Sequence, residues 1–342
     1  MRFLERAWFN NAGWLVLLWP LSLFFQLLAS IRRKIQQRAV RPPSHTVPVV
    51  VIGNISVGGT GKTPLLIELA RYYKRNGFTP GIISRGYGAS TRDFPLQVES
   101  GTAVHVSGDE ALLIRRSTDC PVVIDPDRER ALRYLLEHNN VDVVFSDDGL
   151  QHYRLHRDIE IAVVDGARLF GNGFCLPAGP LRERVGRLQR VDFIIVNGTP
   201  EKPVGVLEHA SLMRLEPRFL VNLKTGDRRP FAGAPFKMGN TVQAVAAIGN
   251  PERFFSALAP LPYPIVKFPF PDHHRFSESD FESGSLDPQQ PIVMTEKDAV
   301  KCQAFARANF WVLNVEVKLQ DEFLQALSQR IIQCKVAISA SK

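Results

Sequence analysis

The chain has 342 residues, of which 45% are hydrophobic; this is enough apolar material for a full core and excludes a largely disordered chain. Its four cysteines lie far apart without a CxxC pair, which argues against a zinc or disulfide framework and fits a reducing compartment. The net charge of +8 does not indicate a nucleic-acid-binding protein, because residues 1–41 hold seven Lys/Arg and one acid and so carry most of it.

The first expected element is a hydrophobic helix. Residues 12–30 contain no charged side chain, and a helix of this length is about enough to cross the hydrocarbon core of a bilayer. Pro20 lies in the middle of the run and basic residues lie at both ends, so a straight span and a helix lying in the interface both fit the pattern. In either case we expect residues 1–41 to associate with a membrane surface.

The next element is a strand, a glycine-rich turn and a helix. The apolar run 49–52 predicts a buried strand, and Pro64 suits the first turn of the helix that follows. Between them lies GGTGKT, which is typical of a phosphate-binding P-loop in which Lys62 reaches the terminal phosphates and the Thr63 hydroxyl binds Mg²⁺. Ser56 stands where the full pattern has its first glycine, which is a small departure. The residues expected to surround a nucleoside triphosphate are Ser56, Val57, Gly58, Gly59, Thr60, Gly61, Lys62 and Thr63.

Two further groups of polar residues follow predicted strands or open a helix. A strand near 78–84 ends in Ser-Arg-Gly-Tyr-Gly, which contains Arg85 and Tyr87. In an α/β sheet the carboxyl ends of strands are where ligands bind. Asp109 and Glu110 open the next helix. An acid at that position either complements the helix dipole or meets a phosphoryl acceptor.

A further buried strand, near 141–147, ends in the pair Asp147 and Asp148. An apolar strand that ends in Asp downstream of a P-loop indicates a carboxylate held near Mg²⁺. Gln151 and His152 follow at the same end. Further strand–helix units follow this stretch, so the fold class we expect is α/β, a P-loop NTPase-type parallel sheet covered by helices on both faces.

The pattern divides the chain into four parts. We expect an arm at 1–41, a P-loop core at 42–214, a linker at 215–240 and a smaller α/β domain at 241–342. The linker is rich in Pro, Gly and mixed charge, and a hairpin is compatible with it. In the last part a loop holds the tripeptide DHH, whose two histidines without nearby ligands favour acid/base or substrate contact over a metal site.

Taken together, SVGGTGKTP, SRGYG, SGDE, DDGLQH, PAGPLRE, DHHRF and TEKDAVK resemble the tetraacyldisaccharide 4′-kinase family, the lipid A 4′-kinases. The motifs occur in the family's order over nearly the whole chain. The resemblance implies transfer of the γ-phosphate of ATP to the 4′-hydroxyl of a tetraacylated glucosamine disaccharide 1-phosphate. It also implies work at the cytoplasmic face of the inner membrane, without a nucleic acid or an obligate protein partner, and closure of two domains around ATP.

The resemblance further implies roles for single residues. Asp109 would be the general base, with His273 beside it to orient and tune it, because a free Asp with a pKa of about 3.9 is a weak base. Lys62 would bridge the β- and γ-phosphates, and residues 295–298 would contact the nucleotide. The candidate Mg²⁺ ligands are Thr63, Asp147, Asp148 and Glu183, and the candidate substrate-contacting residues are Arg85, Tyr87, Gln151 and His152.

Three other classes of protein fit the sequence less well. A membrane-positioning ATPase needs a lysine just before the paired glycines, where this chain has Val57. A metallochaperone GTPase needs a cluster of metal ligands and an NKxD loop, and the sequence shows neither. An adaptor with an inactive P-loop is disfavoured because Lys62, Thr63 and the paired acids are all present.

Overall fold

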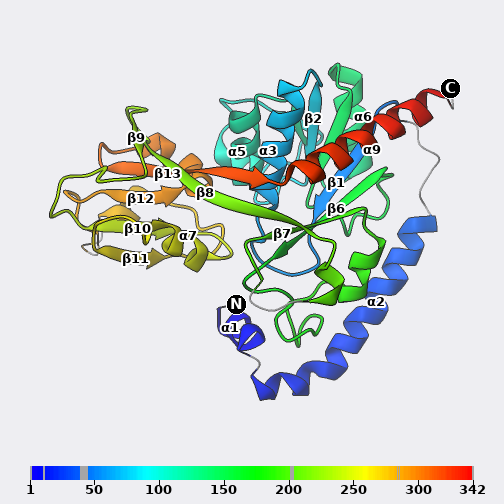
Figure 1. Ribbon diagram of the computed structural model, residues 1–342, viewed down its shortest axis with the longest axis horizontal. Helices are drawn as coiled ribbons and strands as arrows, with labels where there is room; N and C mark the ends of the chain where they lie inside the picture. The colour runs from blue at the N-terminus through cyan, green and yellow to red at the C-terminus, as the bar shows by residue number, and fades with distance from the viewer. Residues whose placement is uncertain are drawn as a thin grey trace.

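The structure, a computed structural model, describes residues 2–10, 12–38, 45–200, 204–282, 284 and 286–340, without the side chains of residues 2 and 3. Two lobes share one thirteen-stranded sheet, and a long helical arm lies along the larger lobe (Figure 1). The strand order is β11-β10-β12-β13-β8-β7-β6-β1-β5-β2-β4-β3, with β9 paired to β8. The expected fold class, an α/β P-loop sheet with a smaller α/β part and an apolar N-terminal helix, is confirmed.

The elements have the following bounds. The strands are β1 (Val49–Gly53), β2 (Pro80–Ser84), β3 (Leu96–Val98), β4 (Val122–Ile124), β5 (Val143–Asp147), β6 (Ile159–Asp165), β7 (Phe193–Asn197), β8 (Ser211–Asn222), β9 (Arg228–Pro230), β10 (Val242–Ala246), β11 (Ile265–Pro269), β12 (Ile292–Thr295) and β13 (Phe310–Leu319). The α-helices are α1 (Arg2–Phe9), α2 (Trp19–Arg38), α3 (Lys62–Arg75), α4 (Val104–Ser107), α5 (Asp109–Thr118), α6 (Arg128–His138), α7 (Pro251–Leu258), α8 (Glu296–Cys302) and α9 (Asp321–Ala340). The 3₁₀ helices are η1 (Gly13–Leu18), η2 (Val185–Arg190), η3 (Gly205–Leu207), η4 (Glu278–Phe281) and η5 (Gln303–Phe305).

The larger lobe is built on parallel strands. These strands are apolar on both faces, as parallel strands that are covered on both sides usually are. β7, β6, β1, β5, β2 and β4 run parallel, and β3 closes the edge antiparallel to β4. Every residue of β1 is buried, as expected for a strand covered on both sides. Helices α3, α5 and α9 pack on one face, and α6 with the segment 150–188 packs on the other. This arrangement leaves the carboxyl ends of the strands free to form a site.

A ribbon of two long strands joins the lobes. β8 runs parallel to β7 and antiparallel to β13, with a bulge between Asn314 and Val315. In the smaller lobe β13, β12, β10 and β11 are parallel, with α7 on one face and α8 on the other. The expected linker at 215–240 therefore begins inside β8 and contains the β8–β9 hairpin. α9 follows the smaller lobe in the chain but packs in the core of the larger one.

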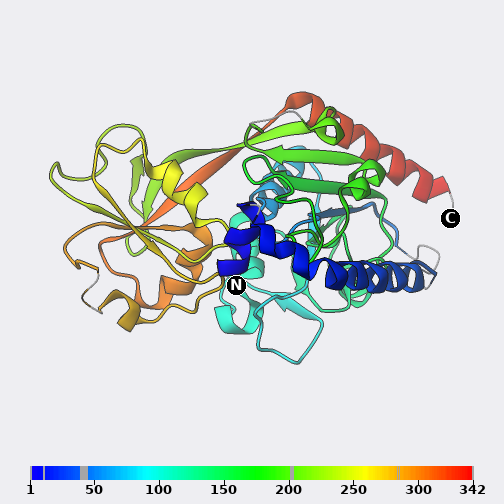
Figure 2. The same ribbon diagram turned by 90° about the horizontal axis from the view of Figure 1, so that it is seen from below.

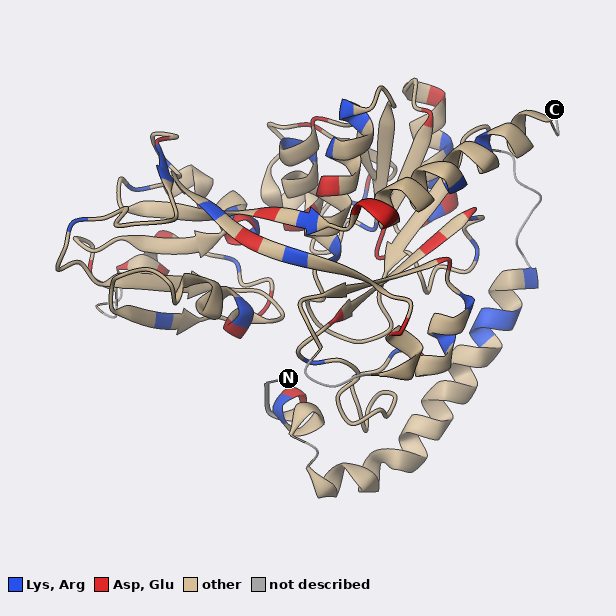
Figure 3. Cartoon of the chain, in the orientation of Figure 1, with Lys and Arg blue, Asp and Glu red and all other residues tan. Residues whose placement is uncertain are grey.

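The N-terminal arm is mostly exposed. It begins near the junction of the lobes, and α2 runs along the larger lobe away from the smaller one (Figures 1 and 2). Within the described residues, 13–38 form one helical stretch long and apolar enough to cross a membrane, with only 11% of its most apolar window buried. Pro20 lies in the first turn of α2, where its missing amide costs no helical hydrogen bond. Lys and Arg residues gather toward the far end of α2 (Figure 3).

The arm is attached to the larger lobe at defined points. The Ser22 hydroxyl is fully buried; it donates to the Cys175 carbonyl at 2.9 Å and accepts from the Ala178 amide at 3.0 Å. The indole of Trp8 donates to the Pro177 carbonyl at 3.0 Å. These bonds hold α1 and α2 against residues 175–178, where the PAGPLRE motif begins, next to the site described below.

Candidate active site

A cleft of about 2690 Å³ lies between the two lobes and the arm. The P-loop, the ends of β2, β5 and β7, and the loops after β10 and β11 line it. All but three of the predicted site residues lie on its wall. Ser56, Asp109 and Asp298 are buried and do not line the cleft.

The P-loop has the shape of a phosphate cradle. Gly58 and Gly61 have φ of +105° and +98°, a conformation that favours glycine, and α3 begins at Lys62. Side-chain amides hold the loop from both sides, because Asn54 donates to the Ser56 carbonyl at 2.7 Å and Asn197 donates to the Thr60 carbonyl at 3.0 Å. Ser56 is not among the described residues with positive φ, so a side chain is tolerated where the full pattern has glycine.

An ion network fixes the P-loop lysine. Lys62 Nζ lies 3.3 Å from one oxygen of Asp148, and Arg182 Nη1 lies 3.1 Å from the other. Burial alone would raise the pKa of Asp148, but the charges of Lys62 and Arg182 outweigh it and hold that pKa well below its usual range. Asp148 has a φ of +45° that turns it back toward the loop. It is therefore an ionised acid beside the expected position of the terminal phosphates.

Its neighbour Asp147 is in a different environment. One oxygen accepts from the Ser84 hydroxyl at 3.3 Å, while the other is buried and has no hydrogen-bond partner in the described part of the chain. Burial, followed by the negative charges of Glu110 and Asp148, raises the pKa of Asp147 to about 7. An unpartnered buried oxygen next to an ionised carboxylate fits a divalent cation, which would supply the missing partner. Thr63 lines the cleft close by, at the start of α3.

Asp109, His273 and Lys297 form a connected array at the first turn of α5. His273 Nδ1 lies 3.1 Å from Asp109 Oδ2, and its Nε2 lies 3.3 Å from Lys297 Nζ. Because the lysine ammonium only donates, the ring carries its proton on Nδ1 and donates it to Asp109. Lys297 also bonds Glu110 at 2.9 Å, which ties α8 of the smaller lobe to α5 of the larger one.

The Asp109 carboxylate is held in its charged form. Burial would raise the pKa of Asp109, but the hydrogen bond from His273 and the charges of Lys297 and Lys301 outweigh burial and lower it. The tyrosine ring of Tyr87 lies against His273, with ring centroids 4.6 Å apart. His273 therefore lowers the pKa of Asp109, which makes the carboxylate a weaker base than a free Asp.

The remaining predicted residues line the cleft in two groups. Arg85 and Tyr87 are on the exposed loop after β2. Gln151 bonds both the Asn54 carbonyl at 3.0 Å and Glu183 Oε1 at 2.8 Å, while the hydroxyl of Tyr153 donates to the other Glu183 oxygen. With both oxygens engaged, Glu183 is less free than Asp147 to bind a cation.

His152 is partly buried on the same side of the cleft. Its Nε2 lies 2.9 Å from the carbonyl of Pro126, to which the neutral ring donates. Burial lowers the pKa of His152; the bond to Pro126 opposes this shift, and the positive charges of Arg128 and other nearby arginines add to it. His152 is therefore a neutral polar group at the cleft wall.

Several residues that the sequence did not single out hold the lobes together. Asp165 bonds Asn250 at 3.1 Å and Arg253 at 2.6 Å, and Arg168 donates to the Gly249 carbonyl at 3.0 Å. Asp165 ends β6 and Asn197 ends β7, so the rule that ligands lie at the carboxyl ends of strands could have found these two. No local pattern marks the two arginines, because their partners are more than fifty residues away.

A P-loop on one lobe, paired acids at the end of the adjacent strand and a histidine–aspartate array contributed by two lobes define a P-loop phosphotransferase. A family model described as tetraacyldisaccharide-1-P 4′-kinase matches residues 14–332. The chain belongs to the tetraacyldisaccharide 4′-kinase family, and it is a kinase of lipid A biosynthesis that acts at the 4′ position of the lipid A precursor. The resemblance drawn from the sequence motifs is confirmed.

Individual relatives cover almost the whole chain. The tetraacyldisaccharide 4′-kinase of Nitrosococcus oceani is 47% identical over 93% of this chain and 91% of its own length. That of Legionella pneumophila (strain Lens) is 43% identical over 95% and 96%. The crystal structure of the "apo" form of LpxK from Aquifex aeolicus in complex with ATP superposes with a TM-score of 0.73 at 28% identity, over 93% of this chain and 99% of that one.

Proposed function

We propose that the cleft transfers the γ-phosphoryl group of ATP to the 4′-hydroxyl of a tetraacylated glucosamine disaccharide 1-phosphate, with Asp109 accepting the hydroxyl proton. The observation that carries this assignment is the array of Asp109, His273 and Lys297, in which His273 and Lys297 line the same cleft as Lys62 and bond the buried Asp109 and its neighbour Glu110. The A. aeolicus relative was solved with ATP, which supports ATP as the donor here.

The lowered pKa of Asp109 limits what kind of base it is. A carboxylate that is ionised at neutral pH is always ready to accept a hydrogen bond, but it takes a full proton only late. Phosphoryl transfer tolerates this, because its transition state is loose and most of the catalysis is positioning and charge stabilisation. Asp109 would therefore orient the 4′-hydroxyl for in-line attack and take its proton as the new bond forms, while His273 holds the carboxylate in place.

The charge of the triphosphate requires counterparts on the protein. Lys62 would contact the β- and γ-phosphates, and loop amides 58–63 would bind their oxygens at the amino end of α3. Asp147, Asp148 and Thr63 would hold Mg²⁺, which when bound neutralises phosphate charge. Asp148 would exchange its contact with Lys62 for the cation once the phosphates occupy the loop. Arg85, Tyr87, Gln151 and His152 remain our candidates for contacts to the acceptor.

The arm would keep the site at the inner membrane, on its cytoplasmic face. Residues of α2 form part of the cleft wall, so a lipid held in the bilayer reaches the P-loop without leaving the interface. The exposed apolar side chains of η1 and α2 are Trp14, Val16, Leu17, Trp19, Leu21, Leu23, Phe24, Leu27, Leu28, Ile31 and Ile35. A patch of this extent marks a contact surface, and the basic residues 32–34 beside it suit anionic lipid.

The decisive experiment follows ³²P from ATP into the lipid. Purified protein in detergent, with Mg²⁺ and a tetraacylated glucosamine disaccharide 1-phosphate, should label the lipid on thin-layer chromatography. Asp109→Asn should lower the rate by about 10²–10⁴-fold while ATP binding stays intact. Labelled lipid at an unchanged rate in this variant would remove Asp109 from its role, and ATP hydrolysis by wild type without labelled lipid would refute the proposed transfer.

A further inference from the structure

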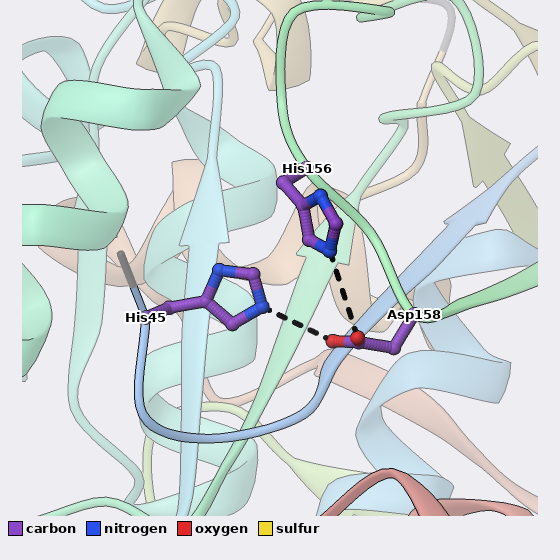
Figure 4. Close-up of side chains that lie close together, drawn as sticks. All are labelled: His45, His156 and Asp158. Carbon is purple, nitrogen blue, oxygen red and sulfur yellow. Dashed lines mark hydrogen bonds and ion pairs between the residues drawn. The ribbon is translucent and has the colours of Figure 1, made fainter. Parts of the chain in front are cut away.

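A second group of potential metal ligands lies away from the cleft (Figure 4). His45 lies in the segment that leads into β1, and His156 and Asp158 lie in the segment that leads into β6. β1 and β6 are neighbouring parallel strands, so their amino ends bring these side chains together. The P-loop follows the carboxyl end of β1, so a strand length of roughly 16 Å separates the group from the phosphate site.

The donor atoms are spaced for a small cation. His45 Nε2 lies 3.2 Å from Asp158 Oδ2, His156 Nε2 lies 3.7 Å from Asp158 Oδ1, and the three ligand atoms all lie within 4.8 Å of one another. The Nε2 atoms of His45 and His156 both point at the Asp158 carboxylate (Figure 4). Tetrahedral zinc, with bonds of about 2.0–2.1 Å, places its ligand atoms roughly 3.4 Å apart. The two histidine–aspartate distances are close to this spacing, and an ion would fit once the two imidazoles, whose donor atoms lie up to 4.8 Å apart, move closer to each other.

The group is held in position by the backbone of the strands. The Val49 amide donates to Asp158 Oδ2 at 2.8 Å, and the Asp158 amide donates to the Val49 carbonyl at 2.9 Å. His156 and Asp158 are two residues apart in the irregular segment that precedes β6, and their side chains meet on one side of it. Arg157 between them bonds Glu160 at 3.1 Å and the Leu150 carbonyl at 3.0 Å, which keeps its positive charge directed elsewhere.

Burial and access also suit a metal. The His45 side chain is 3% exposed and that of Asp158 14%, which shields the donors from water. The His156 side chain is 33% exposed and leaves a path from solvent. An ion would replace the proton now shared between His45 and Asp158, and it would be bound by two neutral imidazoles and one carboxylate.

We propose that His45, His156 and Asp158 bind one zinc-type transition-metal ion, with water completing the coordination. Imidazole nitrogens select zinc, cobalt or nickel over Mg²⁺, which requires oxygen ligands, so this site is chemically distinct from the one at the P-loop. The ion would fasten the segment that arrives from α2 to the start of the central strand. The role of the ion would be structural, because it would lie at the amino ends of β1 and β6, whereas the cleft lies at the carboxyl ends of the strands.

The test is a metal titration of the full chain, purified without a histidine tag and stripped with chelator. Co²⁺ should bind with a stoichiometry of one and give the strong visible absorption of a four-coordinate ion, and Zn²⁺ should displace it while millimolar Mg²⁺ does not. His45→Gln and His156→Gln should each weaken binding at least tenfold. The exposed His209 offers a matched control, and His209→Gln should bind as wild type does. Zn²⁺ should also raise the melting temperature of wild type but not of the two ligand variants.

Two outcomes would overturn the site. Wild type that binds neither Co²⁺ nor Zn²⁺ at micromolar concentrations leaves only a hydrogen-bonded cluster, and this result needs no variant to fold. Binding that persists equally in His45→Gln, His156→Gln and His209→Gln places the ion elsewhere, for instance at the histidines of the DHH loop.

Discussion

Asp109 shows how a single side chain links stability to pH. Its pKa in the folded protein is lowered, because the hydrogen bond from His273 and the charges of Lys297 and Lys301 outweigh the effect of burial. A group whose folded pKa lies below its unfolded value stabilises the fold above the unfolded value, which is about 3.9 for Asp. That stabilisation disappears as the pH falls through the folded pKa.

Replacing this carboxylate should therefore cost stability at neutral pH and little in acid. We expect Asp109→Asn to lower the free energy of unfolding at pH 7, and the gap to wild type to narrow toward pH 3. Urea unfolding at both pH values measures the two gaps. A gap that is equal at both would show that the charge of Asp109 contributes nothing to stability.

We infer that Lys297 positions His273 in the array, because its ammonium group contacts His273 Nε2. Without its ammonium group, His273 Nε2 no longer has a donor to face, so the ring can carry its proton on the wrong nitrogen. We expect Lys297→Met to lower kcat about tenfold or more and to change the pH profile of kcat. Lys335, which pairs with Asp142 on the surface, provides the control Lys335→Met. Equal rates for the two variants would refute the role.

At the scale of single residues, the sequence predicted which chemical groups form the site better than it predicted which side chains contact one another. The P-loop residues, the paired acids and Asp109 are recognisable because each lies at a strand or helix end that local pattern predicts. The functional roles of the site residues stay predictions, and the contact between Glu183 and Tyr153 shows a limit of the sequence. Their side chains meet from positions thirty residues apart, so no spacing in the chain signals that the Glu183 oxygens are already engaged.

At the scale of elements, α2 depends on one buried hydroxyl. Ser22 bonds the Cys175 carbonyl and the Ala178 amide; an apolar replacement leaves the amide without a partner and leaves the carbonyl only its bond from the Gly179 amide. We expect Ser22→Val to weaken the docking of α2 by roughly 1–3 kcal/mol. Hydrogen exchange in α2 and at residues 175–178 should become faster. Ser30→Val on the same helix is the control, because Ser30 is exposed; faster exchange in both variants would contradict the assignment.

The β8–β13 ribbon is the element that the sequence concealed. Buried and exposed positions follow no strict alternation along β8, and Pro217 interrupts its apolar pattern. Such a stretch resembles a linker in sequence, because a ribbon between two lobes packs against little hydrophobic core and so needs few apolar residues. Its pairing is set instead by nine residue pairs with β13, about a hundred positions later in the chain. Long-range pairing of this kind leaves no local signal.

At the scale of the whole molecule, the two lobes approach each other closely at the P-loop. A β-carbon at position 249 would lie 2.6 Å from the Gly59 nitrogen, so any side chain there forces the lobes apart. We expect Gly249→Val to lower kcat/KM for ATP by roughly 10²-fold without lowering the melting temperature. Gly205→Val, at a position with open space, is the control. Unchanged kinetics in Gly249→Val would mean that this approach is dispensable.

The position of α9 has a consequence for the order in which the protein is made. Phe323, Leu327 and Ile331 complete the core beside Tyr73, whose hydroxyl lies 3.1 Å from that of Ser328. A ribosome therefore releases the whole smaller lobe before the larger one can close its apolar face. A nascent chain halted at residue 320 should bind more of an apolar dye such as ANS than one halted beyond the full helix, because both also expose the apolar side chains of α2. The lobe that is begun first is thus the last to be finished, and chaperones that shield apolar surface would meet it throughout that interval.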